Sequence, residues 1–122
     1  MLEAGGEQGV ILDDAHGSDG SQWDTIHTPA GGSRLPTSVE TVEARQHYMR
    51  VHGRDVFKFA VSKFRGLIKQ SLDRNEFAPS DLKLVIPHQV NLRIIEAAVK
   101  KLDIDLDRVY VCLLYTSDAA DE

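Results

Sequence analysis

Cysteine and long apolar runs are nearly absent from this sequence. Cys112 is the only cysteine among 122 residues, which excludes an internal disulfide framework and any zinc site built from several cysteines. No apolar run approaches the roughly 18–20 residues of a membrane-spanning helix. The first 30 residues contain no basic segment followed by a hydrophobic stretch, which is the pattern of a signal peptide. We therefore expect a cytoplasmic protein that does not bind a membrane.

An excess of basic charge is also absent. The chain has 14 Lys and Arg residues against 19 Asp and Glu residues, a formal net charge of -5. Nucleic-acid binding relies on a basic surface, so we expect no nucleic-acid partner. Hydrophobic residues make up 42% and charged residues 27%, which is typical of a globular protein. A chain of this length suits one modest domain.

The segment 112–122, CLLYTSDAADE, matches the translation of a nucleotide string that resembles the transposase adaptor of sequencing libraries. The match covers the whole segment, so we interpret these residues as adaptor-derived. The alternative is a genuine polar C-terminus. On the first interpretation Cys112 is not the protein's own residue, and the protein itself is represented by residues 1–111.

Short apolar or alternating segments predict three β-strands in the first half of the chain. They are GVILDD (residues 9–14), QWDTIHTP (22–29) and HYMRVHG (47–53). The segment AGGSRLPTS (30–38) predicts a loop, because adjacent glycines and a proline interrupt either regular pattern. Residues 54–72 instead place apolar side chains at spacings of three and four, which predicts an amphipathic helix.

The later part of the chain predicts a βαβ unit. LKLVI (82–86) is typical of a buried strand, and Pro87 ends it because proline cannot donate to a sheet ladder. Asn91 is a candidate N-cap for a helix over residues 91–102, and DRVYV (107–111) predicts the next strand. The chain is therefore expected to be an α/β protein with a parallel strand pair and a right-handed crossover.

His88 lies where the first of these strands gives way to the helix. In α/β sheets, ligands gather at the carboxyl ends of strands and the amino ends of the following helices. The partial positive charge of a helix N-terminus favours a neutral imidazole and a developing anion nearby. His88 is thus a candidate donor to an oxyanion. A histidine that is hydrogen-bonded for purely structural reasons is the alternative.

Several segments, taken in order, resemble one family. VIPHQVNLRII is similar to the histidine motif of beta-ketoacyl-acyl carrier protein synthase III, in the thiolase superfamily, and GSDG, PAGGSRLP and GRDVFKFAV are similar to other segments of it. The resemblance covers about residues 9–111. It implies that residues 1–111 are part of the C-terminal lobe of a thiolase-like layered α-β-α fold, with a mixed sheet and the βαβ unit at its C-terminal end.

The resemblance implies a decarboxylating Claisen condensation in fatty acid biosynthesis. In that family a cysteine accepts an acyl group from acyl-CoA, and malonyl-acyl carrier protein then loses carbon dioxide to give an enolate. His88 would stabilise the enolate oxygen together with an asparagine from a later Gly-Asn-Thr-Ser segment. No cysteine precedes Cys112 and the asparagine segment is missing, so this chain by itself is expected to be inactive.

Further roles are implied residue by residue. Positions that match substrate or pantetheine contacts are Asn91, Phe57, Ala60 and Val90. Basic positions that match the docking site of the acidic carrier protein are Lys58, Arg93, Lys100 and Lys101. The bland alternatives are a helix cap for Asn91, core packing for Phe57 and Ala60, and solvated helix faces for the basic residues. The resemblance implies no cofactor, since coenzyme A thioesters are substrates, and a homodimeric parent.

Other readings of the sequence remain. The five histidines have spacings that match no compact metal-ligand motif, so we expect no metal site. A noncatalytic α/β interaction module that docks an acidic partner is one alternative function. A thiolase-superfamily condensing enzyme that uses coenzyme A in place of carrier protein is another. In isolation, the chain is expected to expose faces that pack against the rest of its parent, and therefore to be poorly soluble or partly ordered.

Overall fold

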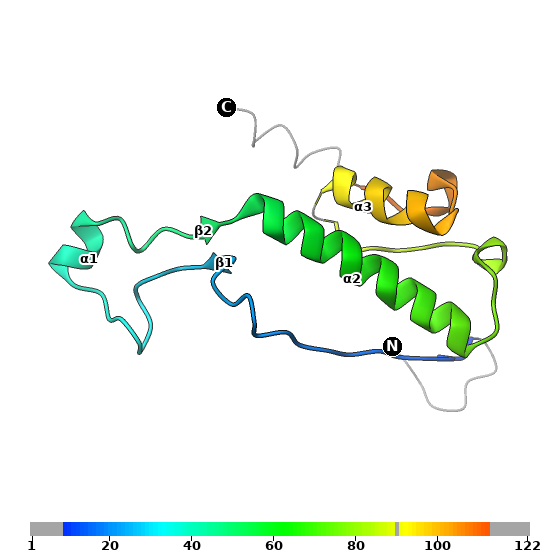
Figure 1. The fold of residues 1–122 in the computed structure, drawn as a ribbon, viewed down its shortest axis with the longest axis horizontal. Coiled ribbons are helices and arrows are strands. Elements are labelled where there is room, and N and C mark those ends of the chain that lie inside the picture. Colours follow the sequence, from blue (N-terminus) through cyan, green and yellow to red (C-terminus); the bar gives the residue numbers. More distant parts are fainter. Residues whose placement is uncertain (1–8, 90, 113–122) are drawn as a thin grey trace. The chain divides into compact units, whose positions relative to one another are not determined.

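The computed structural model describes residues 9–89 and 91–112 (Figure 1). These residues form two compact units, which are described separately. One unit is Gly17–Ala60, and the other contains the residues up to His16 together with those from Val61 onward. No helix among the described residues is long and apolar enough to cross a membrane.

The unit Gly17–Ala60 contains a short antiparallel ladder. Strand β1 (Ile26–His27) pairs with β2 (Arg50–Val51), and the pairing is extended by a hydrogen bond from the His52 N–H to the Thr25 carbonyl at 2.8 Å. The strands predicted over 22–29 and 47–53 therefore exist, but each is only two residues long. A hairpin without a further strand is marginal, because few cross-strand contacts offset its ordering.

Helix α1 (Val39–Glu43) connects β1 to β2 and begins at a capping box. The Thr41 N–H donates to the Ser38 hydroxyl oxygen at 3.3 Å, and the Ser38 N–H donates to the Thr41 hydroxyl oxygen at 2.8 Å. Two hydrogen bonds lower the pKa of Glu40. The larger effect comes from the Ser38 side chain, and the smaller from the backbone N–H of Glu40 itself. A carboxylate is favoured there because Glu40 lies in the first turn of α1.

The predicted helix over 54–72 is confirmed as α2 (Gly53–Arg74). From Val61 onward it belongs to the second unit, where Phe64, Ile68 and Leu72 lie on its inner face. Leu72 is buried, and Phe64 and Ile68 pack against the core. The spacing of three and four between apolar residues was sufficient to predict this helix, because a helix satisfies its backbone hydrogen bonds internally.

The strand predicted over 9–14 was wrong. These residues have no regular structure, and Val10 is 77% exposed. A strand must exchange hydrogen bonds with a neighbouring strand. Among the described residues, none pairs with this segment in a ladder. An apolar composition alone could not supply the partner.

The second unit keeps the connectivity of the predicted βαβ motif with little regular strand. Val85 and Val109 form a parallel bridge, in which the Val85 N–H donates to the Arg108 carbonyl and the Tyr110 N–H to the Val85 carbonyl, both at 2.8 Å. Helix α3 (Leu92–Val99) lies between the two bridged residues in sequence. The strands predicted over 82–86 and 107–111 are thus reduced to one bridge. The handedness of the crossover stays a prediction.

Short 3-10 helices complete this unit: η1 (Pro79–Asp81), η2 (Lys100–Leu102) and η3 (Leu106–Arg108). The core consists of buried residues from α3 and the segments after it, with partly buried side chains of α2 and the bridged segments around them. The buried members are Ile95, Val99, Ile104 and Val109. The face of the bridged segments that turns away from this core is uncovered, since Leu84 is 54% and Ile86 71% exposed.

Three helical segments end in the same way, at a residue other than glycine with a left-handed backbone. Arg45, Glu76 and Asp103 have φ values of 54°, 58° and 58°. After α2, the Phe77 N–H donates to the Leu72 carbonyl at 3.0 Å and the Glu76 N–H to the Asp73 carbonyl at 3.4 Å. This is the Schellman arrangement, in which glycine is the usual left-handed residue because it has no Cβ.

Candidate active site

His88 lies between the bridged residue Val85 and Asn91, the N-cap of α3. Its position at the strand-to-helix junction is therefore as the sequence predicts. The side chain is exposed, and no hydrogen bond or ion pair to the imidazole is found within residues 9–89 and 91–112. Buried polar groups in native structures are nearly always hydrogen-bonded, and this imidazole is neither buried nor hydrogen-bonded within these residues. The geometry leaves the imidazole available to a ligand.

The backbone next to His88 is held by Gln89. The Gln89 Nε2 group donates to the Pro87 carbonyl at 2.9 Å and to the Tyr110 carbonyl at 3.0 Å. The Gln89 Oε1 atom accepts from the Cys112 N–H at 2.9 Å. The partners fix the orientation of the amide, because carbonyl oxygens only accept and a backbone N–H only donates. The side chain thus links the junction to the segment that follows Val109.

Asn91 is confirmed as the cap of α3. Its backbone is extended, with φ -158° and ψ 121°, and its Oδ1 atom accepts from the Arg93 N–H at 2.9 Å. The residue is exposed. A structural role is therefore present, and contact with a pantetheine arm stays a prediction.

Arg93 lies in the first turn of α3, where no acidic residue is present. A cation at this end opposes the helix dipole by about 0.3–1 kcal/mol, whereas a cation at the C-terminal end is favoured. Lys100 and Lys101 follow α3 directly and are exposed. The dipole of α3 favours positive charge at this end, which is sufficient to explain Lys100 and Lys101. Arg93 is exposed as well, so a solvated helix face is the alternative to a docking role for all three residues.

Three of the remaining predicted residues belong to the other unit. Phe57, Lys58 and Ala60 belong to the unit Gly17–Ala60, where Phe57 and Lys58 are exposed and Ala60 is half-buried. The predicted substrate tunnel and four-residue docking surface, which would combine both units, therefore stay predictions. Val90 lies outside the described residues.

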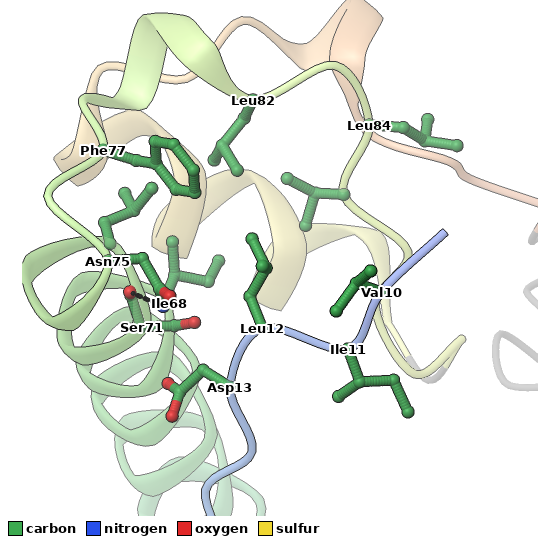
Figure 2. Close-up of a pocket in the computed structure, with 12 residues that line it drawn as sticks. Val10, Ile11, Leu12, Asp13, Ile68, Ser71, Asn75, Phe77, Leu82 and Leu84 are labelled. Carbon is green, nitrogen blue, oxygen red and sulfur yellow. Dashed lines mark hydrogen bonds between the residues drawn. The ribbon is translucent and has the colours of Figure 1, made fainter. Parts of the chain in front are cut away.

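An apolar groove of about 440 Å³ lies elsewhere in the second unit (Figure 2). The segment 10–13 lines one side of it, and residues of α2, Asn75, Phe77 and the segment 82–85 line the rest. His88 does not line this groove. It is therefore separate from the junction at which the imidazole is exposed.

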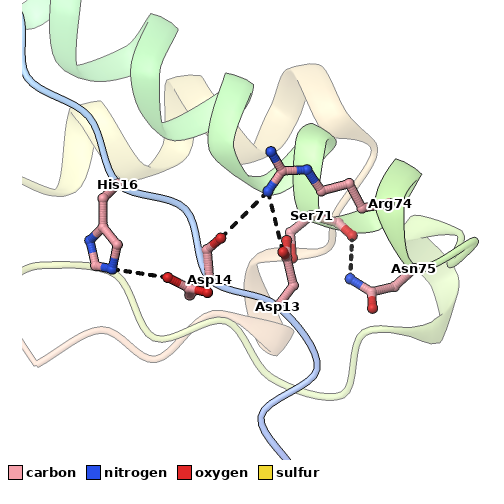
Figure 3. A network of polar contacts seen from close by, with 6 residues as sticks. All are labelled: Asp13, Asp14, His16, Ser71, Arg74 and Asn75. Atoms are coloured by element: carbon pink, nitrogen blue, oxygen red, sulfur yellow. Dashed lines mark hydrogen bonds and ion pairs between the residues drawn. The ribbon is translucent and has the colours of Figure 1, made fainter.

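A polar network joins the segment 13–16 to Arg74, the last residue of α2 (Figure 3). The Arg74 Nη1 group donates to Asp13 Oδ1 at 3.3 Å and to the Asp14 carbonyl at 3.4 Å, and His16 Nε2 lies 3.1 Å from Asp14 Oδ2. The exposed His16–Asp14 pair contributes about 0–1 kcal/mol, whereas the Asp13 side chain in the Arg74 pair is only 16% exposed. Within the described part of the chain, no group of three or more His, Cys, Asp and Glu residues could hold a metal ion.

Comparison with known proteins places this junction in a family. Residues 72–116 match the model "3-oxoacyl-[acyl-carrier-protein (ACP)] synthase III C terminal". The beta-ketoacyl-[acyl-carrier-protein] synthase III of Clostridioides difficile (strain 630) is 45% identical over 104 residues, which are 85% of this chain and 32% of that protein. The chain belongs to the synthase III family. The synthase III of Roseiflexus castenholzii (strain DSM 13941 / HLO8) is 41% identical over 113 residues, which are 93% of this chain and 34% of that protein.

Solved structures of synthase III agree with the α/β fold class. The 3-oxoacyl-(acyl carrier protein) synthase III of Pseudomonas aeruginosa PAO1 has a TM-score of 0.65 and 33% identity, covering 81% of this chain and 27% of that one. The enzyme of Thermus thermophilus has a TM-score of 0.64 and 33% identity, covering 80% and 29%. The thiolase-like fold is thereby confirmed. The chain spans about a third of the length of the curated relatives it matches.

Proposed function

We propose that the full-length protein containing this segment is a beta-ketoacyl-acyl carrier protein synthase III of fatty acid biosynthesis. It condenses acyl-CoA with malonyl-acyl carrier protein and releases carbon dioxide. The observation that carries the proposal is the exposed imidazole of His88 at a strand-to-helix junction, in the part of the chain that matches the synthase III C-terminal model.

His88 acts in this proposal on the malonyl thioester. When the carboxylate leaves as carbon dioxide, the electrons of the broken C–C bond pass to the thioester and give an enolate. An N–H of the imidazole donates to the enolate oxygen. The enolate carbon then attacks the acyl carbon carried by the cysteine of the parent, and the C–S bond breaks to release the cysteine thiolate. Donors aimed at a developing oxyanion are worth about 3–4 kcal/mol each. His88 therefore contributes through anion stabilisation and needs no cofactor.

The partners follow from the same proposal. Acyl-CoA supplies the starter group and acyl carrier protein delivers the malonyl group. Asn91, Phe57, Ala60 and Val90 contribute to the substrate and pantetheine path. Carrier protein is acidic, and the proposed docking residues are basic: Lys58, Arg93, Lys100 and Lys101.

Arg93 is the first of these residues to test, because its charge opposes the dipole of α3, whereas the charges of Lys100 and Lys101 are favoured at the other end of the helix. We also propose a cytoplasmic homodimer.

The 122-residue chain alone is proposed to be inactive in condensation. It has no cysteine other than Cys112, and it lacks the later asparagine segment. One anion-stabilising group cannot by itself form the acyl-enzyme that the enolate must attack.

The proposal is tested in the full-length protein with purified acyl-CoA and malonyl-acyl carrier protein. The His88→Ala variant is expected to lower the condensation rate by about 10²–10³-fold, the effect of removing one oxyanion donor. His16→Ala is the matched control, because His16 is also exposed and lies far from the junction in sequence. A wild-type protein that does not condense these substrates, or a fully active His88→Ala variant, would contradict the proposal.

A further inference from the structure

We propose that Gln89 is a positioning residue for His88, an inference that rests on the proposed function. Gln89 does not touch the reacting atoms in this account. It fixes the backbone from which the imidazole projects, through one hydrogen bond to Pro87 and two to the neighbouring segment, at Tyr110 and Cys112.

The junction needs such a restraint because little else holds it. One parallel bridge, at Val85 and Val109, is the regular pairing between the two segments within residues 9–89 and 91–112. Beyond Val85 the chain runs through Pro87, which has no N–H to donate. The bond from Gln89 to the Tyr110 carbonyl and the bond from the Cys112 N–H continue the link between the segments past the bridge. They do so directly beside His88.

The pattern of donors and acceptors selects glutamine. One side chain must donate to two carbonyl oxygens and accept from one N–H. Glutamate would keep the acceptor but present a negative charge to both carbonyl oxygens. Methionine has a similar length but makes none of the three bonds, and asparagine has the right groups on a stem that is one methylene shorter. The bond from residue 112 uses its backbone N–H, so any residue except proline can supply it.

Positioning matters here because an oxyanion donor must be aimed at the place where charge develops. A displacement of about 1 Å can lower a rate by about 10²-fold. The effect should be confined to the step that uses His88. Decarboxylation of the malonyl thioester uses it, whereas acyl transfer from acyl-CoA to the cysteine does not.

The test measures both half-reactions in the full-length protein. Gln89→Met is expected to slow decarboxylation by about 10- to 100-fold while acyl transfer stays within about twofold of wild type. Gln89→Glu is expected to be at least as slow, and Gln89→Asn to lie between Gln89→Met and wild type. Gln70→Met is the matched control, because Gln70 is exposed on α2. Thermal unfolding of each variant is followed in parallel, and Gln89→Asn decides the question if Gln89→Met does not fold.

Three outcomes would overturn the inference, and they differ from one another. Equal losses in both half-reactions would mean that Gln89 supports the fold as a whole. Unchanged decarboxylation in a folded Gln89→Met or Gln89→Asn variant would mean that the three bonds do not position His88. A wild-type protein that performs neither half-reaction would refute the proposed function first, and this inference with it.

Discussion

Replacing the N-cap of α3 separates the two roles that Asn91 can have. The cap is one hydrogen bond, from the Arg93 N–H to the Asn91 side chain at 2.9 Å. Loss of such a cap costs about 1 kcal/mol, within a range of about 0.5–2 kcal/mol. Since RT is about 0.6 kcal/mol, the opening equilibrium of α3 should increase about fivefold in Asn91→Ala. The effect should reach the core, because Ile95, Ala98 and Val99 are buried residues of this helix.

Amide hydrogen exchange of residues 92–99 is the assay, because it reports the local stability of α3 and does not depend on a cooperative melt of the whole chain. Asn91→Asp keeps the oxygen acceptor and adds a negative charge to a first turn that has no acid, so its exchange should be equal to or slower than that of wild type. Asn91→Ala that exchanges as slowly as wild type, or Asn91→Asp that exchanges as fast as Asn91→Ala, would refute this reasoning.

The same variants carry a functional readout in the full-length protein. If Asn91 only caps α3, activity should follow stability, and Asn91→Asp should retain the wild-type KM for the malonyl substrate. If its NH2 group contacts the pantetheine arm, Asn91→Asp should raise that KM although the helix is intact. A raised KM in a fully capped variant would therefore establish the second role.

Three further predictions concern the core, a helix end and the docking surface. Ile95 is 2% exposed, so Ile95→Ala should lower the free energy of unfolding of this chain by about 2–5 kcal/mol. Ile86→Ala, at an exposed position, should change it by about 0.5 kcal/mol or less. Urea unfolding measures both. Glu76→Gly should stabilise the chain by about 0.5–1 kcal/mol because glycine adopts the left-handed backbone without a Cβ clash, and an equal gain from Glu76→Ala would count against this cause. Changing both Arg93 and Lys100 to Ala should raise the KM for malonyl-acyl carrier protein but not for malonyl-CoA, and unchanged kinetics would contradict the carrier-protein assignment.

Helices α2 and α3 could be predicted from the sequence because each makes its own backbone hydrogen bonds, whereas the five-residue helix α1 was not predicted. The apolar spacing of α2 and the cap at Asn91 were both sufficient local signals. The strands could not be predicted reliably, because a strand depends on a partner elsewhere in the chain. Residues 9–14 have a strand-like composition and no ladder partner among the described residues.

The position of His88 could be predicted, but the restraint beside it could not. The change of apolar period around Pro87 marked the junction, and the resemblance to synthase III suggested the chemistry. Gln89 gave no comparable signal, because its partners Tyr110 and Cys112 lie 21 and 23 residues away in sequence. The left-handed helix ends could not be predicted either. Glycine would have marked these turns, but the positions are occupied by Arg45, Glu76 and Asp103.

The central claim is that the His88 imidazole stabilises the enolate formed when the malonyl thioester loses carbon dioxide. The most direct test is the rate of carbon dioxide release from malonyl-acyl carrier protein by the full-length protein, compared between wild type and His88→Ala. We expect the variant to be slower by about 10²–10³-fold while acyl transfer to the cysteine continues. Carbon dioxide release at the wild-type rate would contradict the claim.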